Sequence, residues 1–403
     1  MSGARLLVLI AALIGSGAAA TMAGDDSGRT ASPPADTDRA PEWPQPAGAG
    51  PTADGRANPL RWWASAEYVF GWVRGAASPP LLIATPTGGG TPSVLFPNDR
   101  LNGDVRGGFQ LRGGLWLDEC QTCGIEAGVF VLCPSADRAR VGDTPGTIIG
   151  RPFFNVQTGA PDFQLVSQPG ALSGRSAVDA ESSHFCAFDL AFHKAICCND
   201  CGRLDALVGY RCLSFADSVR ELEDLHPTAA PFPPGSRIGV ADEFLASNQF
   251  HGLLVGLAGE YRFDHWYAEA RGAVSLGRTS HRVTIAGATQ IETPPAPPVL
   301  FPGGLLAATS NAGTFSGSDW VVVPEASLRL GYRVTEACRV FVGYSCLYWP
   351  KVSRAAEQID PALNPDLLPP PILPPTGPIR PLFPDRTSAL WVHAVSIGVE
   401  WKY

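Results

Sequence analysis

Two groups of cysteines have a spacing that can bind a metal ion or form disulfides. Cys120 and Cys123 make one CxxC motif, Cys198 and Cys201 make a second, and Cys197 adjoins the second. Four thiolates can bind zinc, but 74 residues separate the two motifs, which is more than in the usual zinc ribbon. In an oxidising compartment, cysteines of this kind form disulfides instead. We therefore expect disulfides or free thiols at these five positions, and no metal site.

The chain carries no pattern of residues that indicates an enzyme. Its seven histidines are scattered, and neither a GxSxG nor an HExxH motif occurs. A hydrolase needs a nucleophile with a base in reach, and His393 and Ser388 would lie on opposite faces of one strand. Glycine pairs such as those in GFQLRGG precede no helical pattern, so they fit bends in strands and not phosphate-binding loops. We expect a protein without catalytic residues and without a cofactor.

The composition favours an all-β protein. Of the 403 residues, 44 are Gly and 38 are Pro, and inside a helix Pro costs about 3 kcal/mol and Gly about 1 kcal/mol. The formal net charge of −8 argues against binding to nucleic acid. No apolar run reaches the roughly 18 residues that a membrane-spanning helix needs. An all-β fold is therefore the best-supported class.

The first 59 residues have the composition of an export signal followed by a linker. Arg5 precedes an apolar run over 6–14, and small residues follow as far as Ala20, which is the order found in a secretory signal peptide. Residues 24–58 contain one aromatic residue and no aliphatic residue larger than Ala, too little to offset the entropy of ordering. We expect a signal peptide at 1–20, a disordered Pro- and Asp-rich linker at 21–59 and a folded domain at 60–403.

From residue 60 onward, apolar and polar residues alternate with a period of two, which is typical of β-strands. The clearest case is the stretch WYAEARGAVSLG at 266–277. Most of the alternating segments have 12–16 residues, and a tilted strand needs about 9–11 residues to cross a bilayer. Ten such segments lie near 61–74, 104–118, 122–133, 182–195, 203–216, 248–263, 266–281, 319–334, 337–349 and 388–402.

The connections between these segments are long and short in strict alternation. All long connections would then lie on one rim, as in an outer-membrane barrel with long external loops and short periplasmic turns. The long ones span about 75–103, 134–181, 217–247, 282–318 and 350–387, and the short ones about 119–121, 196–202, 264–265 and 335–336. We expect an up-and-down antiparallel transmembrane β-barrel of about ten strands, or of twelve if a loop adds a hairpin.

Within the segments, charged residues fall on the face opposite the aliphatic ones. An Arg facing lipid at the middle of the bilayer costs about 2–4 kcal/mol, so the charged face should line the lumen. His251 and His393 are exceptions on the apolar face. The charges expected to face the lumen are Glu67, Arg112, Glu126, Asp189, Asp205, Arg211, Glu260, Glu269, Arg271, Glu325 and Arg329.

Aromatic residues concentrate near the ends of the segments. Amphipathic rings prefer the level of the lipid headgroups, which would give two girdles around the barrel. The residues expected to form them are Trp62, Trp72, Trp266, Trp320, Tyr332, Tyr348, Trp391, Trp401 and Tyr403.

Several stretches within the folded domain are similar to one known family. They include RWWASAEYVFGWVRG, GGFQLRGGLWLDECQTCGIEAGVFVL, CCNDCGRLDALVGYRCLSF and ALWVHAVSIGVEWKY. On these stretches the chain resembles the bacterial β-barrel porin-7 family, which implies a barrel in the outer membrane and a porin role. The terminal Tyr403, with Trp401 and Val399 on the same face, resembles the assembly signal of many outer-membrane barrels. The expected partners are therefore outer-membrane lipid and the barrel assembly machinery.

Two functions remain open at this point. The expected function is that of a porin that passes small polar solutes, and the alternative is a closed structural or surface-interaction barrel without transport. About eight strands leave an interior filled by side chains, whereas 16–18 strands enclose an aqueous channel, so ten strands lie nearer the closed end. The Pro- and Leu-rich stretches at 76–100, 282–316 and 350–386 either fold inward as a plug or lie against a neighbouring molecule.

Overall fold

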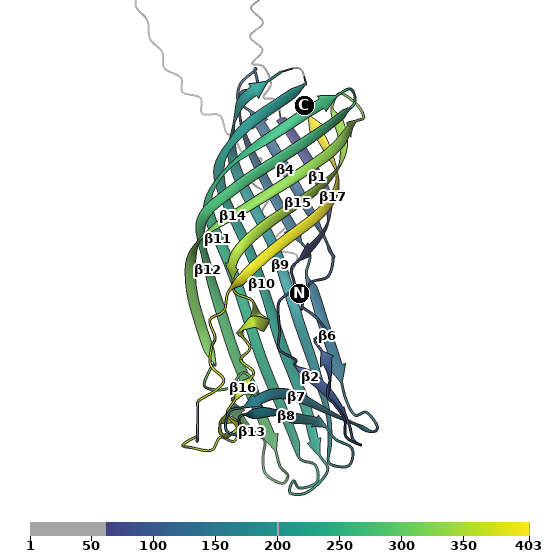
Figure 1. The fold of residues 1–403 in the computed structure, drawn as a ribbon, viewed down its shortest axis with the longest axis vertical. Coiled ribbons are helices and arrows are strands. Elements are labelled where there is room, and N and C mark those ends of the chain that lie inside the picture. The colour runs from purple at the N-terminus through teal and green to yellow at the C-terminus, as the bar shows by residue number, and fades with distance from the viewer. Residues whose placement is uncertain (1–61, 200, 403) are drawn as a thin grey trace, which may run out of the picture. The chain divides into compact units, whose positions relative to one another are not determined.

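Ten antiparallel strands close into a ring (Figure 1). The computed structural model describes residues 62–199 and 201–402. The members of the ring are β1 (Trp62–Val73), β4 (Arg106–Trp116), β5 (Cys123–Leu132), β9 (Leu172–Cys198), β10 (Gly202–Pro227), β11 (Arg237–Phe263), β12 (Trp266–Glu292), β14 (Gly313–Arg333), β15 (Cys338–Val352) and β17 (Ser388–Lys402). Strand β1 pairs with both β4 and β17, and β9 pairs with β10, so the sheet closes on itself. This confirms the predicted β-barrel of about ten strands.

The short and long connections lie at opposite ends of the ring. We call the end with the short connections, such as Asp264 and His265 between β11 and β12, the turn rim, and the opposite end the loop rim. The start of β1 and the end of β17 lie at the turn rim. The signal peptide and linker predicted at 1–20 and 21–59 lie outside the described residues. No helix within the described residues is long and apolar enough to cross a membrane.

Four neighbouring strands are far longer than a bilayer requires. Strands β9 to β12 have 26 or 27 residues each, or roughly 85 Å at 3.3 Å per residue. The loops predicted there are therefore wrong over much of their length, at 134–181, 217–247 and 282–318. In the extensions the interior positions include the charged Glu221 and Glu223, while the outward Leu222 is exposed. Beyond the membrane, the outward face is therefore no longer the apolar one and the inward face the polar one. The prediction of strands from the sequence depended on that alternation.

The rest of the long connections forms small elements at the loop rim (Figure 1). A second sheet consists of β2 (Leu82–Pro86), β3 (Ser93–Phe96), β7 (Thr147–Asn155), β8 (Ala160–Ser167) and β16 (Ala362–Leu363). Strand β6 (Ser135–Val141) pairs with β9, and β13 (Val299–Pro302) pairs with β12. The short 3-10 helices are η2 (Ala355–Gln358) and η3 (Pro365–Leu367).

Part of the last long connection folds into the barrel. Arg354 Nε donates to Asp217 Oδ2 at 2.7 Å, and the Ala355 N–H donates to Asp217 Oδ1 at 2.9 Å. The Ser353 N–H donates to Asn248 Oδ1 at 2.8 Å. Asp217 and Asn248 are buried residues of β10 and β11, so these bonds hold the segment inside the barrel wall. We call residues 353–363 the plug.

Two matched isoleucines test the placement of the plug. Ile359 is 2% exposed among buried apolar residues, whereas Ile372 is 62% exposed. We expect Ile359→Val to lower the free energy of unfolding by about 0.5–1.5 kcal/mol, because it shortens a buried side chain. Ile372→Val should change it by less than about 0.5 kcal/mol. Urea unfolding in lipid vesicles measures both values, and equal changes would place Ile359 outside a packed core.

The two largest groups of buried apolar side chains lie at different levels of the interior. Of these two, the group nearer the turn rim includes Phe215, Phe250 and Trp349, each of which is 0% exposed. We call this level the apolar layer. Its members are Val69, Val73, Leu132, Phe185, Ala187, Leu213, Phe215, Phe250, Val321, Val323, Leu347, Trp349, Val352, Leu390, Val392 and Ala394. The second level contains Phe244 of β11 together with plug residues such as Ile359.

Aromatic side chains form two bands on the outward face. Near the turn rim these are Trp62, Trp266, Tyr332 and Trp401. On the loop-rim side they are Trp72, Trp320, Tyr348 and Trp391. Three other strand tryptophans, Trp63, Trp116 and Trp349, face the interior instead. Tyr403 lies outside the described residues.

Candidate functional site: the charged interior of the barrel

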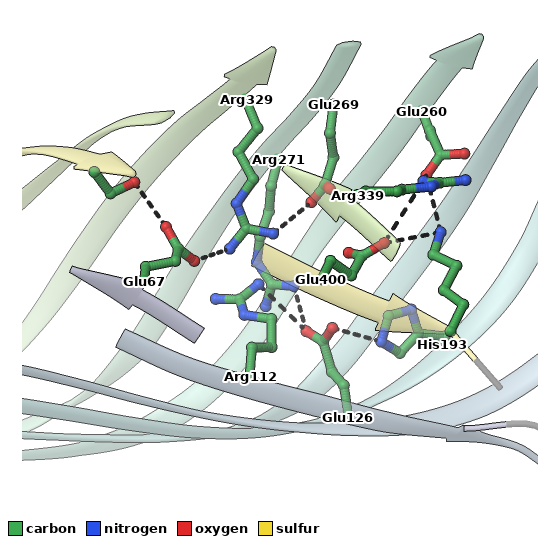
Figure 2. A network of polar contacts seen from close by, with 12 residues as sticks. Glu67, Arg112, Glu126, His193, Glu260, Glu269, Arg271, Arg329, Arg339 and Glu400 are labelled. Carbon is green, nitrogen blue, oxygen red and sulfur yellow. Dashed lines mark hydrogen bonds and ion pairs between the residues drawn. The ribbon is translucent and has the colours of Figure 1, made fainter. Parts of the chain in front are cut away.

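The strands carry the predicted lumen charges into the interior of the ring. Successive side chains of a strand point to opposite faces, so every second residue faces inward. Figure 2 shows the guanidinium groups of Arg112, Arg271 and Arg329 meeting near the centre, with Glu67 and Glu126 beside them. The eleven predicted residues, all buried or half-buried, are Glu67, Arg112, Glu126, Asp189, Asp205, Arg211, Glu260, Glu269, Arg271, Glu325 and Arg329.

Arg271 of β12 contacts three carboxylates. It pairs with Glu126, Nη2 lies 3.5 Å from Asp189 Oδ2, and Nε lies 3.7 Å from Glu325 Oε1. Arg211 Nη2 donates to Glu325 Oε1 at 2.6 Å and lies 3.4 Å from Asp189 Oδ1. These five residues come from β5, β9, β10, β12 and β14, so their ion pairs join half of the strands of the ring across its interior.

Arg329 of β14 makes a second group of contacts. It pairs with Glu67, and its Nη1 lies 3.4 Å from Glu269 Oε1. Ser396 Oγ donates to Glu67 Oε2 at 2.7 Å. The Arg329 Cζ lies 4.8 Å from the centroid of the Phe341 ring. The guanidinium is therefore held by two carboxylates and by an aromatic face.

A third group lies toward the turn rim, near the ends of β11 and β17, and Figure 2 shows its Glu260, Arg339 and Glu400 close together. Glu260 Oε2 accepts hydrogen bonds from Arg339 Nη1 at 2.8 Å and from Lys402 Nζ at 3.3 Å. Glu400 Oε1 lies 3.6 Å from Arg339 Nη1 and 3.2 Å from Lys402 Nζ. Two carboxylates thus share two cations where the lumen meets the turn rim.

The prediction from sequence missed several members of this network. Arg203 Nε donates to Asp205 Oδ2 at 2.7 Å, and His193 Nε2 lies 2.8 Å from Glu126 Oε2. Glu400 alternates with the outward-facing Trp401, so the period-two pattern of β17 was sufficient to find it. His193 and Arg203 likewise share the interior face of their own strands.

A smaller and a larger cavity lie among the described residues of the membrane-crossing interior. One has about 70 Å³ and is lined by residues that include Arg211 and Phe185. The other has about 260 Å³ and lies toward the turn rim. Arg112, Arg271 and Arg329 line both cavities and so separate them. The apolar layer lies on the loop-rim side of the smaller cavity, and its side chains Phe215, Phe250 and Trp349 have no exposed surface.

Another charged cluster lies in the strand extensions, around Arg151 of β7. Its Nη2 lies 2.6 Å from Asp242 Oδ2 and 2.7 Å from Glu221 Oε2, and its Nη1 lies 3.2 Å from Glu223 Oε1. Burial raises the pKa of Glu221 to about 8 and that of Glu223 to about 7; Arg151 opposes the rise and the neighbouring carboxylates add to it. We call these four residues the Arg151 cluster. It was missed because its strands were predicted to be loops.

All ten cysteines are free thiols. Four of the five in the CxxC turns are exposed, and Lys194 Nζ lies 3.2 Å from the half-buried Cys123 Sγ. No disulfide joins Cys120 or Cys123 to Cys197, Cys198 or Cys201. Of the two states expected at these positions, disulfides or free thiols, the structure has free thiols. Within residues 62–199 and 201–402, no group of three or more metal-binding side chains is found.

The two histidines on the lipid-facing side both have a tyrosine partner. The Tyr210 hydroxyl lies 2.5 Å from His251 Nδ1, and the Tyr344 hydroxyl lies 2.8 Å from His393 Nδ1. Each pair joins two adjacent strands. The tyrosine hydroxyl gives the imidazole a hydrogen-bond partner, which lipid cannot supply. The alternation along one strand does not predict a partner on the neighbouring strand. The sequence therefore identified His251 and His393 as exceptions on the apolar face, but not their tyrosine partners.

Comparison with known families agrees with this architecture. The sequence model of one family, described as putative beta barrel porin-7, matches residues 63–403. The chain belongs to this family. It is therefore an outer-membrane β-barrel, as the resemblance in its strands implied. No curated protein matches the chain.

Several solved barrels are similar to this porin-7 family member at low identity. The outer membrane protease OmpT of Escherichia coli has a TM-score of 0.41 and 11% identity, covering 85% of this chain and 97% of that one. A FadL homologue of Pseudomonas aeruginosa has a TM-score of 0.23 and 9% identity, covering 85% and 90%. The toluene transporter TodX of P. putida has a TM-score of 0.18 and 9% identity, covering 85% and 89%.

Proposed function

We propose that this porin-7 family member is a closed barrel that serves as a structural or surface-interaction protein, without transport and without enzymatic activity. The observation that carries the proposal is the apolar layer. Phe215, Phe250 and Trp349 fill the lumen with no exposed surface, and the plug lies on their loop-rim side. A water-filled pore needs a wetted path along the whole barrel, and a ring of ten strands is narrow enough for side chains to block it.

The loop rim supports the interaction part of the proposal. We place it outside the cell, because long loops face outward in outer-membrane barrels. Three exposed apolar side chains in the long connections are Leu300 at 70%, Ile372 at 62% and Leu373 at 74% exposure. Adjacent exposed apolar side chains, such as the consecutive Ile372 and Leu373, favour contact with another molecule. Lipid and the barrel assembly machinery remain the proposed partners of the membrane-crossing part.

A pore for small polar solutes is the second candidate. The charged cavities of about 70 and 260 Å³ favour it, since they provide polar space inside the membrane-crossing part. Such a pore also requires the apolar layer to move aside.

Swelling of proteoliposomes in isosmotic sugar and amino-acid solutions separates the two candidates. We expect the folded protein to give the swelling rate of protein-free liposomes, because the apolar layer blocks solutes larger than water. A known open porin reconstituted in the same way serves as the positive control. Swelling above the protein-free rate would favour the pore.

A further inference from the structure

Arg112 differs from the other arginines that line the larger cavity, because it donates no hydrogen bond within the described residues. Its side chain is 9% exposed. The nearest carboxylate oxygens are Glu126 Oε1 at 3.8 Å from Nη1 and Asp189 Oδ1 at 3.9 Å from Nη2, both beyond hydrogen-bond distance. A guanidinium has five N–H donors, and buried donors are rarely left without an acceptor. The site therefore lacks an acceptor beside Arg112.

Neighbouring carboxylates are already occupied by other cations. Glu126 is paired with Arg271 and His193, and Asp189 lies 3.4 Å from Arg211. Both form ion pairs with Arg112 at 3.8 and 3.9 Å, but neither accepts a hydrogen bond from it. The Arg112 guanidinium can therefore turn toward the cavity that it lines.

The larger cavity has the charge and the size to hold an anion. Six arginines and one lysine line it against five carboxylates, which leaves an excess of two positive charges. Its volume is about 260 Å³, and a water molecule takes up about 30 Å³ in the liquid. Arg262 and Lys402 in its wall are 41% and 36% exposed, so the cavity opens at the turn rim.

We propose that this cavity binds a tetrahedral oxyanion, inorganic sulfate or phosphate, with Arg112 as its principal ligand. The planar fork of a guanidinium donates two parallel hydrogen bonds to such an anion. Arg271 lines the same cavity, and its Nη2, which lies 3.5 Å from Asp189 Oδ2, donates no hydrogen bond. The anion enters from the turn rim, so binding does not require an open lumen.

Binding of radiolabelled sulfate tests the proposal, since sulfate keeps its charge throughout the neutral range. The full-length protein, folded in detergent micelles, is dialysed against sulfate at constant ionic strength. We expect one saturable site per barrel. Arg112→Gln should weaken binding at least tenfold, and Arg112→Lys should weaken it less, because lysine keeps the charge but lacks the fork. The matched control Arg138→Gln, at a position of β6 whose side chain is 55% exposed, should bind as the wild type does.

Two results would overturn the proposal. One is the absence of saturable binding to the wild-type protein, which would mean that water alone occupies the cavity. The other is sulfate affinity in Arg112→Gln equal to that of the wild type. If Arg112→Gln fails to fold, Arg112→Lys decides, because unchanged affinity in that variant would exclude recognition by the guanidinium fork.

Discussion

Replacing Arg151 with Met should lower the free energy of unfolding by about 3–5 kcal/mol at pH 8.5, and by clearly less at pH 5. The substitution leaves Glu221, Glu223 and Asp242 buried without a cation, and removing one partner of a buried ion pair has an effect of this size. At pH 5 the two glutamates are protonated, so most of the unpaired charge disappears. Urea unfolding in lipid vesicles, followed by circular dichroism at both pH values, measures the difference.

Arg220→Met is the matched control for this variant. Arg220 is adjacent to Glu221 on β10 but points outward, and its exposed Nε donates to Glu243 Oε1 at 3.0 Å. Exposed ion pairs contribute about 0–1 kcal/mol, so this change should be small at both pH values. The Arg151 cluster is not a buried charge site if Arg151→Met lowers the free energy of unfolding as little as Arg220→Met does. The same holds if the change in Arg151→Met does not depend on pH.

The wild-type protein should itself gain stability as the pH falls from about 8 to about 5. The pKa of Glu221 is about 8 and that of Glu223 about 7 in the folded state, against an ordinary value of 4.5. Over this range the folded state binds protons that the unfolded state does not, so acidification favours folding. The same unfolding series without a substitution checks the direction, and rising stability toward pH 8 would contradict the burial of these carboxylates.

Arg271→Met should cause the largest loss of stability in the membrane-crossing part, again about 3–5 kcal/mol. Arg271 contacts Glu126, Asp189 and Glu325, so its removal weakens the pairing of three carboxylates at once. Unfolding in lipid vesicles, followed by tryptophan fluorescence, measures the change.

The exposed Arg138 provides the control for Arg271. Its Nε lies 3.0 Å from Asp179 Oδ1 on the surface, and its side chain is 55% exposed. Arg138→Met should change the free energy of unfolding by less than about 1 kcal/mol. Equal losses in Arg138→Met and Arg271→Met would mean that the interior network holds the barrel no more firmly than a surface ion pair does.

The sequence was sufficient to locate the ten strands because lipid imposes a strict pattern on them. Facing lipid, strand residues must be apolar, while inward-facing residues such as Arg271 and Glu325 can be charged, so the period of two is unmistakable. The same rule places Glu400 on the inward face of β17, although the prediction from sequence did not include it among the interior charges. The local alternation therefore predicts the strands that form the barrel wall and most of the charged residues in its interior.

The remaining features depend on contacts between segments that are distant in the sequence. The outer halves of β10 and β11 lie beyond the membrane, where no lipid requires apolar residues on the outward face. Their sequence therefore predicts loops, and only the pairing of the strands shows that Glu221 and Asp242 are buried. The plug reaches Asp217 from a position more than 130 residues away, as the bond from Arg354 shows. Trp349 resembles a girdle residue in sequence, yet it packs inside against Phe250, at 6.4 Å between ring centroids. Nothing within a single strand specifies such partners.

Single-channel recording in planar lipid bilayers tests the closed lumen most directly, because inorganic ions are smaller than any solute in the swelling assay. The protein is inserted in its folded form, and insertion is verified independently by protease protection of the membrane-crossing part. Because Phe215, Phe250 and Trp349 fill the interior at 0% exposure, the proposed closed barrel should give no conductance steps over the whole range of applied voltage. Regular, uniform steps from the inserted wild-type protein would contradict a closed barrel and establish a pore.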